Sequence, residues 1–226
     1  LDGRAGVPSA PPEPLVLASR FDPSHPVWQD KRQFLTLMTH ERLAELDTAF
    51  DDSSGVLTIR RHGKQVARGN ITTPMGRDLI NQFLAAFMAE RAPGPPRLVE
   101  GSGISFSDTR EQLISLINLA SLADLERVTR QPVDPLRFRG NLYLSQAEPW
   151  AEHDWVGAEL IAGTARLKVL EPIERCAATT VNPHTAERDM NIPKALMSGF
   201  GHTECGVYAE VLAAGRVSPG DPLTLA

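Results

Sequence analysis

The sequence predicts a mainly β fold that also contains helices (α+β), with a closed or strongly bent sheet in its second half. Two observations support this prediction: several short β-prone segments are separated by Gly and Pro, and few segments have a helical period. The chain has 226 residues, of which 42% are apolar and 23% charged. It can therefore bury a real hydrophobic core, as one large domain or two small ones.

The first part of the chain combines a leader with short elements. Residues 1–14 are rich in Pro, Gly and Ala, which predicts a flexible leader. Residues 33–38 alternate in polarity as a strand does. Residues 40–46 then predict a short helix, with Thr39 as its N-cap.

A hairpin and a long helix are expected next. Residues 55–60 and 65–68 flank the turn signal His62-Gly63, which predicts a β-hairpin. Thr73-Pro74 predicts a helix that begins with Pro in its first position. The apolar residues that follow recur with the helical period: Leu79, Ile80, Phe83, Leu84, Phe87 and Met88.

The second half is richer in strands. The run Pro93–Pro96 separates it from the first half as a boundary or an exposed loop. A capped helix is predicted at residues 118–125, ended by Pro132 and Pro135. Strands are expected at residues 113–117, 137–144, 166–170, 175–181 and 207–212.

Charge and composition disfavour several classes of function. A net charge of −5 argues against nucleic acid or an anionic membrane as partner. No apolar run approaches the ~20 residues of a transmembrane helix. The start has neither the apolar region of a signal peptide nor an initiator Met, so we expect the natural N-terminus to lie upstream. Cys176 and Cys205 are too few for a disulfide scaffold, which predicts a cytoplasmic protein, with one disulfide between them as the alternative.

The segment Glu174–Pro183 carries the strongest chemical signal. It places the Cys176 thiol between Arg175 and the pair Thr179-Thr180, within a predicted strand. A thiolate is a soft metal ligand, and its neighbours are groups that bind anions. A lone Cys lacks the paired spacing of a site for a bare metal ion. A buried structural cysteine is the alternative.

Six further blocks accompany this segment in a definite order. They are Ser107-Asp108-Thr109, residues 118–125, Arg137–Asn141, residues 148–157, residues 205–211 and residues 217–222. With the run Arg-Cys-x-x-Thr-Thr-Val-Asn-Pro, they make residues 97–226 resemble a MOSC domain, the C-terminal domain of molybdenum cofactor sulfurase. Within that family the blocks are most similar to reductases resembling the mitochondrial amidoxime reducing component and its bacterial relatives. Residues 15–96 resemble a remnant of the β-barrel region that usually precedes a MOSC domain.

The resemblance implies a site for the molybdenum cofactor (Mo-molybdopterin). It makes Cys176 the metal ligand and catalytic residue, and the charge of Arg175 would favour its thiolate form. It also makes Arg139 and Asn141 cofactor-binding residues, because a guanidinium and an amide suit a phosphate and a pterin. Alternatively, Arg139 is an exposed residue at a strand start and Asn141 belongs to a turn or bulge.

The same resemblance adds a loop and an aromatic residue. Ser107, Asp108, Thr109 and Arg110 form a polar loop whose N–H and hydroxyl groups can hold an anion, and Asp108 suits pterin N–H donors. An ordinary turn is the alternative. Tyr208 falls where the family has an aromatic residue near the cofactor, although an inward tyrosine of a core strand fits equally well.

Two further features bear on the site. Cys205 and His202 form His-x-x-Cys, and with Cys176 and His184 they could make a zinc quartet, but the spacing is uneven. A substrate-side or buried Cys205 thiol is therefore expected. The Val-Lys-Ser-like segment that the family carries near the start of its N-terminal barrel is not found in this sequence.

Three functional hypotheses follow. The first is a molybdenum-cofactor oxidoreductase that reduces N-hydroxylated or N- or S-oxygenated small molecules. No ferredoxin-type cysteine cluster follows Asp221, so its electrons would come from a separate flavin or iron–sulfur protein. The second is a non-catalytic cofactor or sulfur carrier that uses a persulfide on Cys176. The third is a family member that has lost cofactor binding.

Overall fold

The structure, a computed structural model, describes residues 15–16, 27–89, 94–99 and 107–226. The predicted leader, residues 1–14, lies outside the described residues. The chain divides into two compact units. We call Glu111–Asn182 with Arg188–Ala226 the C-terminal unit, and the described part of Ala10–Arg110 with Pro183–Glu187 the N-terminal unit.

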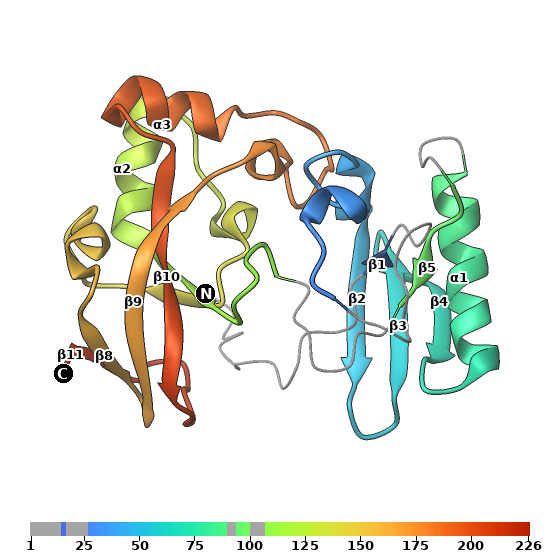
Figure 1. Ribbon diagram of the computed structural model, residues 1–226. Helices are drawn as coiled ribbons and strands as arrows, with labels where there is room; N and C mark the ends of the chain where they lie inside the picture. The colour runs from blue at the N-terminus through green and yellow to red at the C-terminus, as the bar shows by residue number, and fades with distance from the viewer. Residues whose placement is uncertain (1–14, 17–26, 90–93, 100–106) are drawn as a thin grey trace. The chain divides into compact units, whose positions relative to one another are not determined.

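An antiparallel sheet and a helix make up most of the N-terminal unit. The sheet contains β2 (Leu46–Asp51), β3 (Val56–Arg61) and β4 (Lys64–Asn70) in this order. Helix α1 (Pro74–Met88) begins at Thr73, whose hydroxyl accepts a hydrogen bond from the Gly76 amide, and it lies beside β4 (Figure 1). Strands β1 (Leu15–Val16) and β5 (Arg97–Leu98) form a second, antiparallel pair. The predicted hairpin and long helix are confirmed.

Two predictions for the N-terminal unit are wrong. Residues 33–38 form no strand, because the chain turns at Thr36, whose carbonyl accepts from the amides of Thr39 and His40. The short helix predicted at residues 40–46 exists as the 3-10 helix η2 (Glu41–Glu45), and an unpredicted 3-10 helix, η1 (Lys31–Gln33), precedes the turn. The N-cap of η2 is His40 and not Thr39.

A strongly bent six-stranded sheet dominates the C-terminal unit, which confirms the predicted fold class (Figure 1). Its order is β11-β8-β9-β10-β6-β7, and only the β6–β7 pair is parallel. The strands are β6 (Ile114–Asn118), β7 (Leu142–Leu144), β8 (Glu159–Ala162), β9 (Ala165–Glu174), β10 (Glu204–Ala213) and β11 (Leu223–Leu225). Strands β9 and β10 are the longest of them and curve together.

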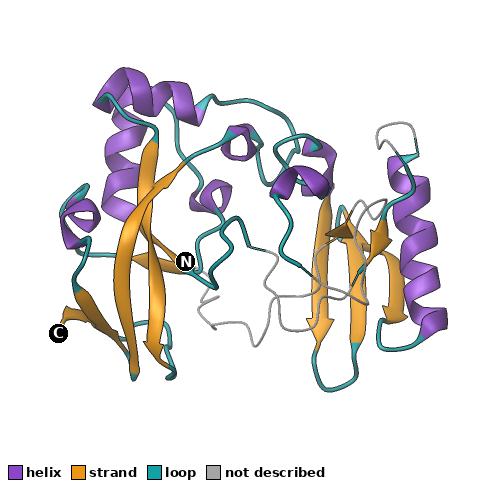
Figure 2. Cartoon of the chain, in the orientation of Figure 1, coloured by secondary structure: helices purple, strands orange, loops and turns teal. Residues whose placement is uncertain are grey.

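Peripheral helices accompany this sheet (Figure 2). They are α2 (Leu119–Thr129), α3 (Ile192–Phe200) and the 3-10 helices η3 (Pro135–Phe138), η4 (Ala151–Trp155) and η5 (Ala177–Thr180). Strand β6 is buried on both faces, because Leu116 packs in one apolar cluster and Ile117 in another, together with α2 and α3. Among the described residues, no helix is long and apolar enough to cross a membrane.

One predicted strand of this unit, residues 175–181, is a helical turn, and another is a strand only in part, since of residues 137–144 only Leu142–Leu144 form β7. Residues 177–180 form η5, because the amide and hydroxyl of Thr179 both donate to the Cys176 carbonyl. Residues 135–138 form η3, which Asp134 caps by accepting a hydrogen bond from the Leu136 amide at 2.8 Å. Both segments that carry the candidate site are therefore turns at the edge of the sheet.

Candidate functional site

The Cys176 turn, residues 175–182, presents a free thiol at the start of η5. Cys176 is half-buried, and its side chain makes no capping hydrogen bond. Its carbonyl accepts from the Thr179 hydroxyl at 2.9 Å, while the Thr180 hydroxyl donates to the Ala177 carbonyl at 2.7 Å. The Thr-Thr pair thus stabilises the turn and leaves the sulfur of Cys176 outside its hydrogen-bond network.

Arg175 holds the start of this turn against the sheet. Its Nε donates to the Cys205 carbonyl at 2.7 Å, its Nη2 donates to the same oxygen, and its Nη1 donates to the Phe138 carbonyl at 3.2 Å. Burial lowers the pKa of this guanidinium, while Cys205 and Tyr208 act in the opposite direction. The Arg175 side chain therefore points inward, and its hydrogen bonds fix the backbone immediately before Cys176.

A β-bulge in β10 makes the Cys205 carbonyl available to Arg175. Glu204 pairs with Glu174 and Val207 with Pro172, so three steps along β10 match two along β9. Gly206 takes up the extra residue at a φ of 77°. A Cβ at this position would lie 2.5 Å from the Leu116 carbonyl oxygen and 3.2 Å from Nη2 of Arg175. Glycine is therefore required where the guanidinium meets the strand.

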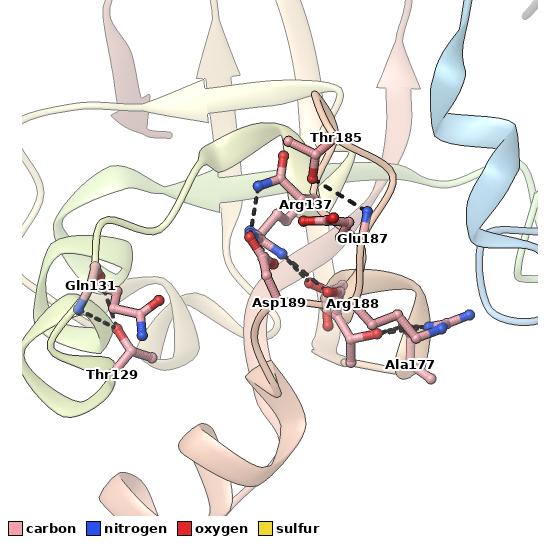
Figure 3. Close-up of polar contacts among 11 residues, drawn as sticks. Thr129, Gln131, Arg137, Ala177, Thr185, Glu187, Arg188 and Asp189 are labelled. Carbon is pink, nitrogen blue, oxygen red and sulfur yellow. Dashed lines mark hydrogen bonds and ion pairs between the residues drawn. The ribbon is translucent and has the colours of Figure 1, made fainter.

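Arg137 fastens the other end of the turn. It is 5% exposed, and its Nη1 lies 3.4 Å from the Thr179 carbonyl oxygen and 3.3 Å from that of Thr180. Its Nη2 lies 2.6 Å from Oδ1 of Asp189 (Figure 3). Arg137 is the first residue of the predicted block Arg-Phe-Arg, and its side chain faces the interior. Arg137 and Arg175 therefore join η3 and the Cys176 turn from opposite sides.

Arg139 is presented to solvent beside this junction. It follows Phe138 in a left-handed conformation, at a φ of 52° and a ψ of 41°, which is costly for a residue other than Gly. It is exposed, and no hydrogen bond or ion pair of its side chain is found within the described residues. Arg175 donates to the Phe138 carbonyl. Arg139 follows Phe138 in the chain and Cys176 follows Arg175, so this one hydrogen bond links the segments that carry Arg139 and Cys176.

Asn141 and Tyr208 both contact Ser115 of β6. Oδ1 of Asn141 accepts from both the amide and the hydroxyl of Ser115 at 2.9 Å. Tyr208 of β10 pairs with the same Ser115 in the sheet and is half-buried. Its phenol also interacts electrostatically with Arg175. The structure thus brings Arg139, Asn141, Arg175 and Tyr208 to one edge of the C-terminal unit.

The polar loop belongs to the N-terminal unit. Asp108 forms an ion pair with Lys31 at 3.0 Å, and the Ser107 hydroxyl donates to the Thr109 carbonyl at 2.8 Å. Trp28 Nε1 donates to the Ser107 carbonyl at 3.2 Å. Asp108 and Arg110 are exposed. The contribution of this loop to the Cys176 site stays a prediction.

Cys205 lies in the core. It is fully buried in the cluster between β6, α2 and α3. Burial raises its pKa to about 12, and Arg175 acts in the opposite direction while Glu152 adds to the rise. The thiol is therefore protonated near neutral pH and is shielded from solvent. Among the described residues no group of three or more His, Cys, Asp and Glu could hold a metal ion, so the zinc quartet has no site there.

A protein-family model matches the part of the chain that contains these turns. The model of the MOSC domain matches residues 100–224, more than half of the chain. The chain belongs to the MOSC domain family. The family resemblance predicted from the Cys176 segment and its accompanying blocks is thereby confirmed.

Several curated proteins match parts of this MOSC chain. Mitochondrial amidoxime-reducing component 1 of Homo sapiens is 30% identical over 134 residues, which are 54% of this chain and 39% of that protein. Mitochondrial amidoxime reducing component 2 of Rattus norvegicus is 30% identical over 122 residues, 49% of this chain and 36% of that protein. The matches thus span about two fifths of the relatives' length.

A solved structure also matches. The crystal structure of YiiM from Geobacillus stearothermophilus is 28% identical in sequence, with a TM-score of 0.39. The match covers 50% of this chain and 53% of that one.

The candidate site contains residues that sequence reasoning missed. Arg137, Asp189 and Asn182 form one network, and Arg188 donates to the Ala177 carbonyl at 3.0 Å and to the Thr180 hydroxyl at 2.7 Å (Figure 3). The signal that could have revealed Arg137 is the preceding Asp134-Pro135, a pair typical of turn starts. A 3-10 turn there directs one Arg of Arg-Phe-Arg inward and leaves the other exposed.

Proposed function

We propose that this MOSC chain is a molybdenum-cofactor-binding oxidoreductase that reduces N-hydroxylated or other N- or S-oxygenated small molecules. The observation that carries the proposal is the free Cys176 thiol, which stands half-exposed on a turn fixed by the buried Arg137 and the half-buried Arg175. Similarity to amidoxime-reducing components supports the class of substrate. The proposed compartment is a reducing one such as the cytoplasm, because both cysteines are free.

The residues of the turn fit such a cofactor. A soft thiolate is the protein ligand that molybdenum favours, and within the described part of the chain the Cys176 side chain makes no capping hydrogen bond that would compete for its sulfur. Arg139 is an exposed cation with no ion pair among the described residues, so its guanidinium is available to a phosphate. The strained backbone of Arg139 also suggests a functional residue, since such conformations gather at binding sites.

Each residue has a distinct proposed role. Cys176 binds the metal, and Arg139 binds the terminal phosphate of the cofactor. The Oδ1 atom of Asn141 is held by Ser115, which leaves its NH₂ group to donate to the pterin. Tyr208 lines the same edge. Arg175 acts through the position of Cys176 and through its charge.

Ser107, Asp108, Thr109 and Arg110 are proposed as further cofactor contacts. Their backbone and hydroxyl groups would have to be redirected to the ligand, because the Ser107 hydroxyl and the Asp108 carboxylate are engaged within the N-terminal unit.

The proposed reaction is a two-electron reduction. For an N-hydroxyl substrate the N–O bond breaks, an N–H bond forms and the oxygen leaves as water. Two electrons and two protons are consumed. The cofactor, when bound, supplies a two-electron centre that accepts oxygen. The electrons are proposed to come from a separate flavin or iron–sulfur protein.

Elemental analysis tests this proposal. The protein at its full natural length is produced in a host that makes the cofactor, and molybdenum per chain is compared between wild type, Cys176→Ala and Cys205→Ala. The Cys205 variant is the matched control, because it removes a thiol that is buried and protonated. We expect near-stoichiometric molybdenum in the wild type and in Cys205→Ala, and a large loss in Cys176→Ala.

The outcome separates the hypotheses. Wild-type protein without molybdenum would rule out the oxidoreductase. Mass spectrometry of Cys176 would then show whether it carries a persulfide, as the carrier hypothesis requires. Equal molybdenum in both Cys variants would keep the cofactor and reject Cys176 as its ligand. Turnover of an N-hydroxyl substrate by loaded protein with a chemical reductant would establish the activity.

A further inference from the structure

A buried network links Arg137 to the end of the Cys176 turn. Nη1 of Arg137 reaches the carbonyl oxygens of both Thr179 and Thr180, the last two residues of η5. The carbonyls at the end of a helix lack partners within that helix, so a cation is stabilising there. Because η5 has only four residues, fixing its end also fixes its N-cap, Cys176, whose carbonyl accepts from the amide and the hydroxyl of Thr179.

Asp189 and Asn182 complete the network at the surface. Asp189 Oδ1 lies 2.6 Å from Nη2 of Arg137, and Asn182 Nδ2 donates to Oδ2 of Asp189 at 2.7 Å. Burial alone would raise the pKa of Asp189, but the hydrogen bonds from Asn182 and Arg137 outweigh it and hold the pKa below its ordinary value. The carboxylate therefore stays charged. It links Arg137 of η3 to Asn182, which lies seven residues before Asp189 in the chain.

The network is a costly way to obtain stability. The side chain of Arg137 is 3% exposed, and its Nε is buried without an acceptor among the described residues. Removing a guanidinium from water costs several kcal/mol, and an unsatisfied buried donor adds about 1–3 kcal/mol. Apolar residues would fill this space with less loss. The arrangement is better explained by what the guanidinium positions than by net stability.

We infer that Arg137 and Asp189 are positioning residues of the reacting thiol: they clamp the end of η5 and so set the place and exposure of Cys176. The inference deepens the proposed function and depends on it only in treating Cys176 as the residue that binds the cofactor. Arg175 fixes the start of the same turn. The two arginines hold the thiol between two fixed points.

Alkylation of Cys176 in the native protein tests the clamp without molybdenum. The variants are Asp189→Ala and Arg137→Lys, and the matched control is Glu159→Ala, which removes the carboxylate of the ion pair with Arg166. Labelling is located by mass spectrometry of the Cys176 peptide. We expect alkylation about fivefold faster in Asp189→Ala, since losing a charge-assisted bond populates a loosened turn. The Glu159→Ala rate should equal that of the wild type.

Arg137→Lys should behave like Asp189→Ala. A single ammonium cannot reach both the Thr179 and Thr180 carbonyls and Asp189, whereas the guanidinium fork does. If this variant does not fold, Asp189→Ala decides the test alone, because Asp189 is 36% exposed. Urea unfolding is followed in parallel, since a merely structural role changes the unfolding midpoint without changing native labelling.

The readouts distinguish failure of the inference from failure of the proposed function. Wild-type labelling rates in both variants, with only the unfolding midpoint lowered, would overturn the clamp. Faster labelling in protein that never carries molybdenum would support the clamp and reject the oxidoreductase. In loaded, partly reduced protein, an electron paramagnetic resonance spectrum altered by Asp189→Ala but not by Glu159→Ala would support both.

Discussion

Replacing Gly206 by Ala tests the bulge that directs Arg175. Its φ of 77° places an Ala in the left-handed region, which costs about 1–2 kcal/mol. The added Cβ would also stand 2.5 Å from the Leu116 carbonyl oxygen and 2.7 Å from Cδ1 of Ile117. The first of these is backbone of the adjacent strand, so β10 must move away from β6.

Such a movement weakens the bonds of Arg175. The Cβ would lie 3.2 Å from its Nη2, which donates to the carbonyl of the neighbouring Cys205. Loss of hydrogen bonds to a charged group costs about 1.5–3 kcal/mol. Together with the backbone strain, Gly206→Ala should lower the free energy of unfolding by about 3–5 kcal/mol.

Gly201→Ala is the matched control. Gly201 has a φ of 80°, but a Cβ there meets no atom within 4 Å. This variant carries the strain without the collision and should lose only about 1–2 kcal/mol. Urea unfolding of both variants, with an unchanged dependence on denaturant, measures the difference. Equal losses for the two variants would refute the reasoning about Arg175 and the bulge.

Three further predictions concern charged residues. Asp189 has a lowered pKa, so its contribution to stability is complete above the unfolded value near 3.8 and is lost as the pH falls through the folded value. Wild type and Asp189→Asn should therefore differ in unfolding free energy at neutral pH and converge in acid, and a constant difference would contradict this. Glu152 is fully buried and accepts from Asn118 and Ser121, both at 2.8 Å. Glu152→Ala leaves the Ser121 hydroxyl and one of the two Asn118 N–H groups without this acceptor, while the other N–H keeps the Glu148 carbonyl, so it should cost about 2–6 kcal/mol in urea unfolding. A loss below about 1 kcal/mol would contradict this role of Glu152. Arg139→Ala should change unfolding by less than about 0.5 kcal/mol but lower the molybdenum content, and full retention of molybdenum would argue against its proposed role.

The periodic elements of this fold could be predicted from sequence. The apolar stripe after Thr73-Pro74 and the turn at His62-Gly63 each depend on local rules, and α1 and the β3–β4 hairpin follow them. The strands β8 and β11 were missed. Their residues are few, and their pairing joins segments some sixty residues apart, which no local pattern specifies.

For the candidate site, the blocks around Cys176 and Arg139 could be found from sequence but their backbone conformation could not. Residues 175–181 look like a strand because Thr and Val are β-prone, yet Thr179 and Thr180 bond back to the chain and close a helical turn. Local hydrogen bonds from side chains overrode the propensity.

The frequency of arginine makes its function hard to judge from sequence, and burial resolves the question. Of the 23 Lys and Arg residues, only four are Lys, so an Arg beside a motif has little significance by itself. In the structure Arg137 and Arg175 use their forks on carbonyl oxygens inside the fold, whereas Arg139 is exposed on a strained backbone. A lysine could replace a surface charge but not a fork that joins two chain segments. The buried Arg137 and the half-buried Arg175 therefore act on the Cys176 turn through geometry, and Arg139 is the one of these three whose side chain is exposed to solvent.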